Sequence, residues 1–189
     1  VIDNIGGAGT GVSENVGQVD SYGLELGLRF DLGTNRGWSF QNPYFVNFTY
    51  TRAELDGDSL SRDPESIFSG GKDGNQVPYI PEFLVNFGAG VETPRWGVAA
   101  VATWSSETYT TASNTTRQLN AEGDPDARFG TADSYFLLDL NAHVNVREGV
   151  KLLGGVQNVT DEEYVASRHP HGPRPGPARF AYVGLELEF

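Results

Sequence analysis

Four polar residues in two long irregular segments have the chemistry best suited to binding a small anion. They are Arg117 and Gln118 in one segment and Arg168 and Arg174 in the next. A guanidinium group donates paired hydrogen bonds to carboxylate or hydroxamate oxygens, and its positive charge strengthens them. If the two segments fold over the same opening, we expect these four residues to contact a substrate.

The histidines and clustered aspartates give weaker indications of a metal site. One residue separates His169 from His171, and this pair could ligate a metal ion. Asp56, Asp58 and Asp63 lie close together but lack the pattern of a 12-residue calcium loop. We therefore expect solvated loop residues here and no metal site.

Composition excludes several other classes of protein. The 189 residues include no cysteine, so disulfide and thiol chemistry are not available. The net charge of −12 argues against a nucleic-acid partner, whose phosphates require a basic surface. No apolar run approaches the ~18 residues of a membrane-spanning helix. Without a nucleophile elbow, a phosphate loop or a spaced carboxylate pair, we expect neither enzymatic activity nor a cofactor.

The elements that must position the polar residues are strands, because seven stretches alternate apolar and polar residues with period 2. In the clearest stretch, Leu138 and Leu140 share one face, and Asp139, Asn141 and His143 share the other. The predicted strands are 22–31, 38–52, 82–92, 96–105, 134–146, 150–157 and 180–189, with residues 1–5 as the tail of an eighth.

Aromatic placement distinguishes a membrane barrel from a soluble sandwich. Trp96 and Trp104 share a strand face and lie eight residues apart, and Tyr22 and Phe30 repeat this spacing. A tilted strand would hold such rings about 20 Å apart along the membrane normal, as in the aromatic girdles of membrane barrels. A sandwich would place its large rings in mid-strand. The sequence therefore predicts an all-β, antiparallel up-and-down meander that forms part of a transmembrane β-barrel.

The connections between these strands alternate between short and long. Outer-membrane barrels have short periplasmic turns and long external loops, so the chain should end in the periplasm, with Phe189 on the lipid face. Segment 53–79 carries six acids against two basic residues, and segment 106–133 carries five against two. This acidic excess means that these loops alone cannot bind a small anion well.

Several motifs resemble the C-terminal end of TonB-dependent outer-membrane receptors. They are NVTDEEY at 158–164, PGPAR at 175–179, the closing strand YVGLELEF at 182–189, and GNQVPYIPE at 74–82. They occur in the order found in that family, and the resemblance covers essentially the whole chain. Within the family, the PGPAR segment is most similar to ferric citrate-type receptors.

The resemblance implies a bacterial outer-membrane barrel of about 22 strands with an N-terminal plug domain. Residues 1–189 would be roughly its last third, with seven or eight strands, and the plug and the TonB-contacting motif would lie outside them. It also implies TonB-energised uptake of a ferric-siderophore or ferric citrate complex. Implied partners are the plug, the remaining strands, outer-membrane lipid and lipopolysaccharide, and the barrel assembly machinery, which would recognise the strand ending at Phe189.

Alternatives remain open at this stage. The substrate could be vitamin B12, an oligosaccharide or another metal, or the chain could belong to a structural or surface barrel that transports nothing. The four candidate residues, Arg117, Gln118, Arg168 and Arg174, could instead contact lipopolysaccharide, neighbouring acids or water.

Overall fold

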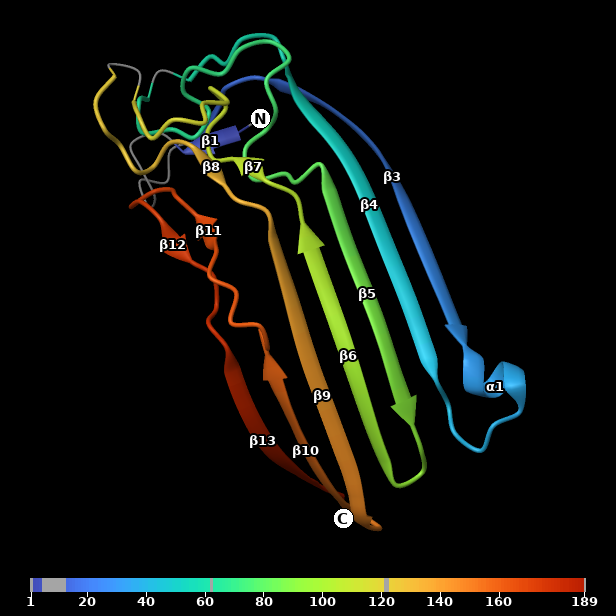
Figure 1. Cartoon of the computed structure of the whole chain (residues 1–189). Coiled ribbons are helices and arrows are strands. Elements are labelled where there is room, and N and C mark those ends of the chain that lie inside the picture. Colours follow the sequence, from blue (N-terminus) through green and yellow to red (C-terminus); the bar gives the residue numbers. More distant parts are fainter. Residues whose placement is uncertain (1, 5–12, 62, 121–122, 189) are drawn as a thin grey trace.

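The fold is a single curved sheet in which each long strand pairs with the next (Figure 1). The computed structural model describes residues 2–4, 13–61, 63–120 and 123–188. The antiparallel sheet has the order β13-β10-β9-β6-β5-β4-β3, so the predicted meander is confirmed. The strands are β3 (Gln18–Asp31), β4 (Pro43–Asp56), β5 (Phe83–Glu92), β6 (Trp96–Ser105), β9 (Tyr135–Arg147), β10 (Val150–Gln157) and β13 (Phe180–Leu187).

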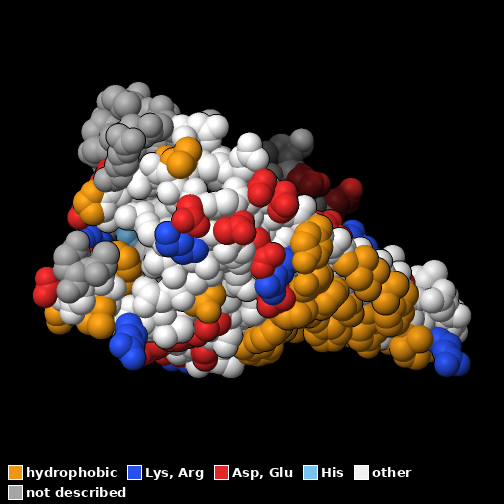
Figure 2. Space-filling view, turned by 90° about the horizontal axis from the view of Figure 1, so that it is seen from above, with side chains coloured by type: hydrophobic (Ala, Val, Ile, Leu, Met, Phe, Trp, Pro, Cys, Tyr) orange, Lys and Arg blue, Asp and Glu red, His pale blue; other side chains and the backbone are white. Residues whose placement is uncertain are grey.

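The register of the strands gives the sheet one apolar face. Ala100 on β6 lies opposite Leu140 on β9, and Leu140 lies opposite Val156 on β10. Residues opposite one another in a ladder point to the same side, so these rows form a continuous surface. Figure 2 shows this surface as an uninterrupted hydrophobic band. Large exposed members of the band include Leu24, Leu26, Leu28, Val98, Leu140, Val144, Val183 and Leu185.

The predicted girdle residues lie at the two ends of this band. Tyr22 and Phe30 are 62% and 51% exposed, and Trp96 and Trp104 are 44% and 38% exposed. Exposing such large rings to water costs free energy, whereas a membrane–water interface accommodates them. A girdle role for these four residues stays a prediction, and the fifth predicted residue, Phe189, lies outside the described residues.

The sheet does not close on itself. Strands β3 and β13 lie at its two edges, and the ladders of the described residues do not pair one with the other (Figure 1). A spanning barrel cannot leave a lipid-exposed edge, because each unpaired N–H or C=O in hydrocarbon costs several kcal/mol. The chain is therefore an arc of a larger barrel, as expected from the sequence.

The two ends of the sheet differ in the length of their connections, and we name them accordingly. The turn end holds helix α1 (Leu32–Arg36) and the turns at 93–95 and 148–149. The loop end holds the three long connections 57–82, 106–134 and 158–179. The buried apolar side chains lie at the loop end of the chain, including the last residues of β4, and not in the middle of the sheet: Val16, Ala53, Leu55, Ala112, Phe129 and Ala132.

The predicted start of the second strand at Trp38 is wrong. The chain instead forms α1 after β3, and β4 begins at Pro43. Asp31 caps this one-turn helix by accepting a hydrogen bond of 2.8 Å from the N–H of Thr34. Gly37 ends it with a φ of 69°, in the left-handed region that favours glycine.

The predicted eighth wall strand is also absent from the described part of the sheet. Residues Ile2–Asn4 form β1, which pairs only with β2 (Ser13–Asn15) in a separate ladder. Two further short ladders lie in the long connections: β7 (Thr108–Tyr109) with β8 (Thr131–Ala132), and β11 (Val165–Ser167) with β12 (Arg174–Pro175). Among the described residues, no helix has the length and apolar character needed to cross a membrane.

Glycine on the inner face makes room for large neighbours. A Cβ at Gly88 on β5 would overlap the ring of Phe45 on β4. The two residues lie opposite each other in the ladder, so the ring covers the bare backbone of the glycine. The inner face can therefore carry an aromatic ring without pushing the strands apart.

Adjacent positions on β3 test the assignment of the two faces. Leu26 is 55% exposed in the middle of the apolar band, whereas Glu25 points to the opposite side. In the complete receptor, we expect Leu26→Arg to cost roughly 2–4 kcal/mol of folding free energy, because it places a charge near the bilayer midplane.

The matched control is Glu25→Arg, which keeps the arginine on the polar face and should fold close to normally. Folding into lipid vesicles at increasing urea concentrations measures both variants. Equal losses of stability would contradict the face assignment.

Candidate functional site

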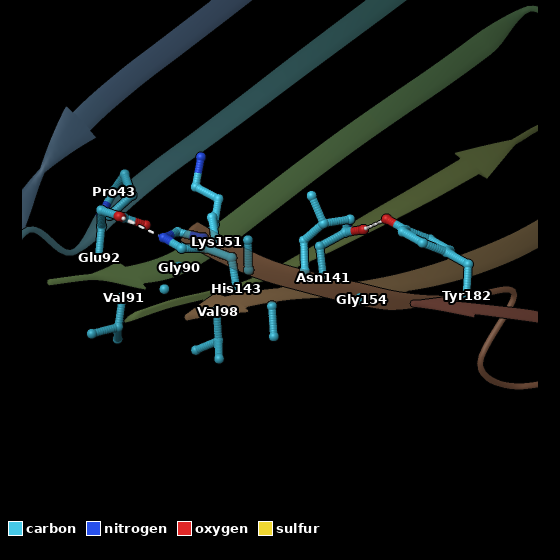
Figure 3. Close-up of a pocket in the computed structure, with 14 residues that line it drawn as sticks. Pro43, Gly90, Val91, Glu92, Val98, Asn141, His143, Lys151, Gly154 and Tyr182 are labelled. Carbon is cyan, nitrogen blue, oxygen red and sulfur yellow. Dashed lines mark hydrogen bonds and ion pairs between the residues drawn. The ribbon is translucent and has the colours of Figure 1, made fainter. Parts of the chain in front are cut away.

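The inner face of the wall carries a network of polar contacts across β5, β9, β10 and β13 (Figure 3). A carboxylate oxygen of Glu92 on β5 lies 3.2 Å from Nε2 of His143 on β9. The hydroxyl of Tyr182 donates a 2.7 Å hydrogen bond to the side-chain oxygen of Asn141. Alternating acids, bases and amides make this a surface for hydrogen bonding.

A shallow hollow of about 330 Å³ lies over this network. A side chain at position 97 would overlap the Glu92 carboxylate and the His143 ring, so Gly97 allows these two groups to meet. The side chain of Lys151 points to the opposite side of the sheet from that of Val91 (Figure 3). Its ammonium group also pairs with Glu186 of β13 at 3.3 Å. The hollow thus lies beside the polar side chains of the inner face.

The three long connections pack against one another at the loop end, and we call them together the loop cap (57–82, 106–134 and 158–179). Asn114 joins two of them, accepting from the N–H of Gln76 at 2.7 Å and donating to its carbonyl at 2.9 Å. Asn75 donates to the carbonyl of Ala112 at 2.7 Å. Thr110 and Thr111 are fully buried among these contacts, so the loop cap has an ordered interior.

The structure places Arg168 inside the loop cap, where only 7% of it is exposed. Its guanidinium donates to the carbonyls of Thr131 at 2.8 Å and Ala127 at 3.2 Å. The backbone N–H groups of Arg168 and His169 both donate to the hydroxyl of Tyr79 at 3.1 Å. Arg168 therefore connects all three loops, a position that sequence reasoning did not indicate.

The other three candidate residues, Arg117, Gln118 and Arg174, are exposed, and Arg174 lies in β12. Arg117 lines a hollow of about 620 Å³ together with Arg128. Sequence reasoning missed Arg128, which pairs with Asp126 at 2.7 Å and also with Glu65. No hydrogen bond or ion pair among the described residues joins the side chains of Arg117 and Arg168.

The histidines and aspartates considered as metal ligands have other environments. The His169 ring packs edge-on against Phe129, and burial lowers the pKa of this histidine. His171 is exposed. The ammonium group of Lys72 donates to Asp58 at 2.9 Å and lowers the pKa of that carboxyl. Within the described ranges, no group of three or more His, Asp and Glu residues is placed to hold a metal ion.

The motifs at 158–164 and 175–179 meet in one compact structure, which we call the latch (Asn158, Asp161, Tyr164, Gly176 and Arg179). The side chain of Asn158 is buried, accepts from the N–H of Glu162 at 2.8 Å, and donates to the carbonyl of Pro177 at 3.1 Å. Asp161 pairs with Arg179 at 3.1 Å and accepts from its backbone N–H. The latch thus ties the end of β10 to the start of β13.

An aromatic stack completes the latch. The ring of Tyr164 fills the place where a side chain at position 176 would lie, and it stacks on Tyr135 with a centroid separation of 4.4 Å. Asn158 and Asp161 have φ values of 49° and 56°, which asparagine and aspartate tolerate better than most residues. Each of these motif residues therefore makes a contact or adopts a backbone conformation that shapes the rim of the wall.

A family model described as "TonB dependent receptor-like, beta-barrel" matches residues 1–159 of the chain. The chain belongs to the TonB-dependent receptor family. It is therefore part of an outer-membrane protein of Gram-negative bacteria, as expected from its strands and motifs. A comparison with curated proteins finds no match.

Solved structures agree with this family assignment. The ferric citrate transporter FecA in its unliganded form superposes with a TM-score of 0.72 and 21% identity, over 90% of this chain and 24% of that one. The ferric-catecholate import receptor Fiu from K12 E. coli gives 0.66 and 18%, over 96% and 22%. The copper transporter OprC gives 0.65 and 19%, over 94% and 24%.

The chain thus spans about a quarter of the length of these structures. At such low identities the likeness establishes the fold of this TonB-dependent receptor segment. The relatives are transporters and receptors rather than enzymes.

The latch gives a prediction for the complete receptor. Asn158→Asp keeps the size of the side chain and its acceptor for the Glu162 N–H, but it turns an oxygen toward the carbonyl of Pro177. We expect a loss of about 1–3 kcal/mol of stability, because a buried donor is lost and a buried acceptor is left unpaired.

Heat-modifiability on gels, which separates folded from unfolded barrels, measures the effect as a lower unfolding temperature. The control is Thr160→Ala, an exposed change in the same turn. If both variants unfold at the same temperature, the latch does not stabilise the rim.

Proposed function

We propose that this chain forms the last part of the wall and part of the external mouth of a receptor for TonB-energised uptake of a scarce nutrient. A ferric-siderophore or ferric citrate complex is the proposed substrate class. The main observation behind this proposal is that one arc of the barrel has both a polar inner face and an ordered loop cap. Relatives titled as ferric citrate and ferric-catecholate transporters support the substrate class.

In this proposal the loop end faces the outside of the cell and the turn end faces the periplasm. The edges of β3 and β13 pair with the remaining strands of the receptor. A plug domain, contributed by another part of the receptor, packs against the hollow over Glu92 and His143. The TonB system acts through the part of the receptor outside this chain.

Arg117 is the proposed first contact for substrate in the loop cap. Its side chain is exposed beside the hollow it shares with Arg128, whose own charge is matched by Asp126 and Glu65. Gln118 and Arg174 are proposed as secondary contacts. Arg168 acts by holding the loops together, since its guanidinium already donates to two backbone carbonyls.

The acidic excess of the loops supports a second candidate function, which is uptake of a neutral or cationic metal complex. Segment 53–79 carries six acids against two basic residues, a balance that disfavours small anions. The structural relative OprC is described as a copper transporter. Comparing ferric and copper complexes in one binding assay separates the two candidates.

Replacing Arg117 tests the proposed contact. In the complete receptor on intact cells, we expect Arg117→Ala to weaken binding of an anionic ferric complex about ten-fold or more, because a charged hydrogen bond contributes roughly 1.5–3 kcal/mol. Lys72→Ala is the control, since Lys72 is an exposed cation of the loop cap that pairs with Asp58 outside this hollow.

Unchanged affinity of Arg117→Ala, at normal surface expression, would assign substrate binding to the plug and to the other loops. Equal losses in both variants would instead indicate a general effect of loop charge, without a site at Arg117.

A further inference from the structure

The turn end of the wall carries three exposed arginines. They are Arg36 in α1, Arg95 in the turn at 93–95, and Arg147 at the end of β9, directly before the turn at 148–149. Connection 32–42 and turn 93–95 contain no Asp or Glu. These two connections are therefore locally basic, although Arg95 also lines a hollow with Glu148, Glu186 and Glu188.

Two of these arginines lie next to exposed tryptophans. Arg36 precedes Trp38 by two residues, and Arg95 directly precedes Trp96, with the indole rings 46% and 44% exposed. Reciprocal backbone hydrogen bonds of 2.9 Å between Gln41 and Glu92 bring the two connections together. Arginine beside tryptophan at a barrel rim is suited to the boundary between lipid tails and head groups.

A hollow of about 360 Å³ lies between these connections, and Trp38, Phe40 and Thr93 line it. The carboxylate of Glu92 also borders it but is engaged by the His143 ring at 3.2 Å. The rings of Trp38 and Phe40 pack against each other with centroids 5.0 Å apart. The hollow thus combines one pair of aromatic rings with polar side chains, between the two connections that carry Arg36 and Arg95.

Two other cations of the wall, Arg52 and Lys151, form ion pairs. At the loop end, Arg52 contacts Glu54 at 2.6 Å and Glu82 at 3.5 Å. Among the described residues, no ion pair or hydrogen bond involves the guanidinium group of Arg36 or Arg95. These two guanidinium groups are therefore available to an external anion.

We propose that Arg36 and Arg95, with the rings of Trp38 and Trp96, bind the phosphate head groups of anionic phospholipid in the periplasmic leaflet. The proposal rests on the orientation given under the proposed function. Guanidinium groups bind phosphate oxygens in pairs, and an anionic leaflet attracts basic residues at its surface. Arg147 contributes less, because Glu148 follows it directly in the sequence.

Short-chain phospholipids test this assignment with the complete receptor in detergent. Dihexanoyl phosphatidylglycerol should raise the unfolding temperature at lower concentrations than dihexanoyl phosphatidylcholine does. In the double variant Arg36→Gln and Arg95→Gln, the phosphatidylglycerol concentration for half of this effect should rise roughly ten-fold. Arg117→Gln is the control, because it removes an exposed cation from the opposite end.

Three results would overturn the proposal: an unchanged phosphatidylglycerol response in the double variant, an equal response to both lipids, or an equal loss in Arg117→Gln. If the double variant keeps its response to phosphatidylglycerol but loses binding to purified peptidoglycan, Arg36 and Arg95 bind the cell wall and not lipid. Affinity for the ferric complex should stay unchanged in the double variant, so this test and the substrate test fail independently.

Discussion

The structure depends on the cost of leaving a backbone hydrogen-bonding group unpaired in hydrocarbon. That cost requires every strand within the membrane to have partners on both sides, and period-2 alternation then separates a lipid face from a polar face. The wall is one sheet thick, so its apolar side chains, such as Leu26 and Leu140, are exposed in the isolated chain. Lipid outside, and neighbouring strands at the edges of β3 and β13, supply the contacts that a core supplies in a soluble domain.

The packed interior of this chain lies instead at the loop end, where it can shape a mouth. Tyr79 and Arg168 connect the three loops through backbone groups, and the latch fixes the third loop to the rim. Buried polar residues hold the loops in place, whereas Arg117, the proposed substrate contact, is exposed.

Sequence reasoning succeeded where a local pattern determines the structure and failed where distant contacts do. Alternation predicted β6 and β10 with their observed ends, since each residue's face follows from its position alone. It mistook Trp38 and Phe40 for strand residues, because an aromatic pair beyond a capped helical turn alternates in the same way. Arg168 resembled a ligand-binding arginine because its carbonyl partners, at Ala127 and Thr131, lie about 40 residues earlier.

Lipid exposure along β9 tests the central claim most directly. The chain contains no cysteine, so single cysteines carrying a spin label can be placed at successive positions 136–145 of the complete receptor in lipid vesicles, provided that the rest of the receptor is also free of reactive cysteine. Collision with dissolved oxygen reports contact with lipid tails. We predict high oxygen accessibility at even positions and low accessibility at odd positions. Uniform accessibility, or the opposite alternation, would show that this sheet is not a barrel wall with the assigned faces.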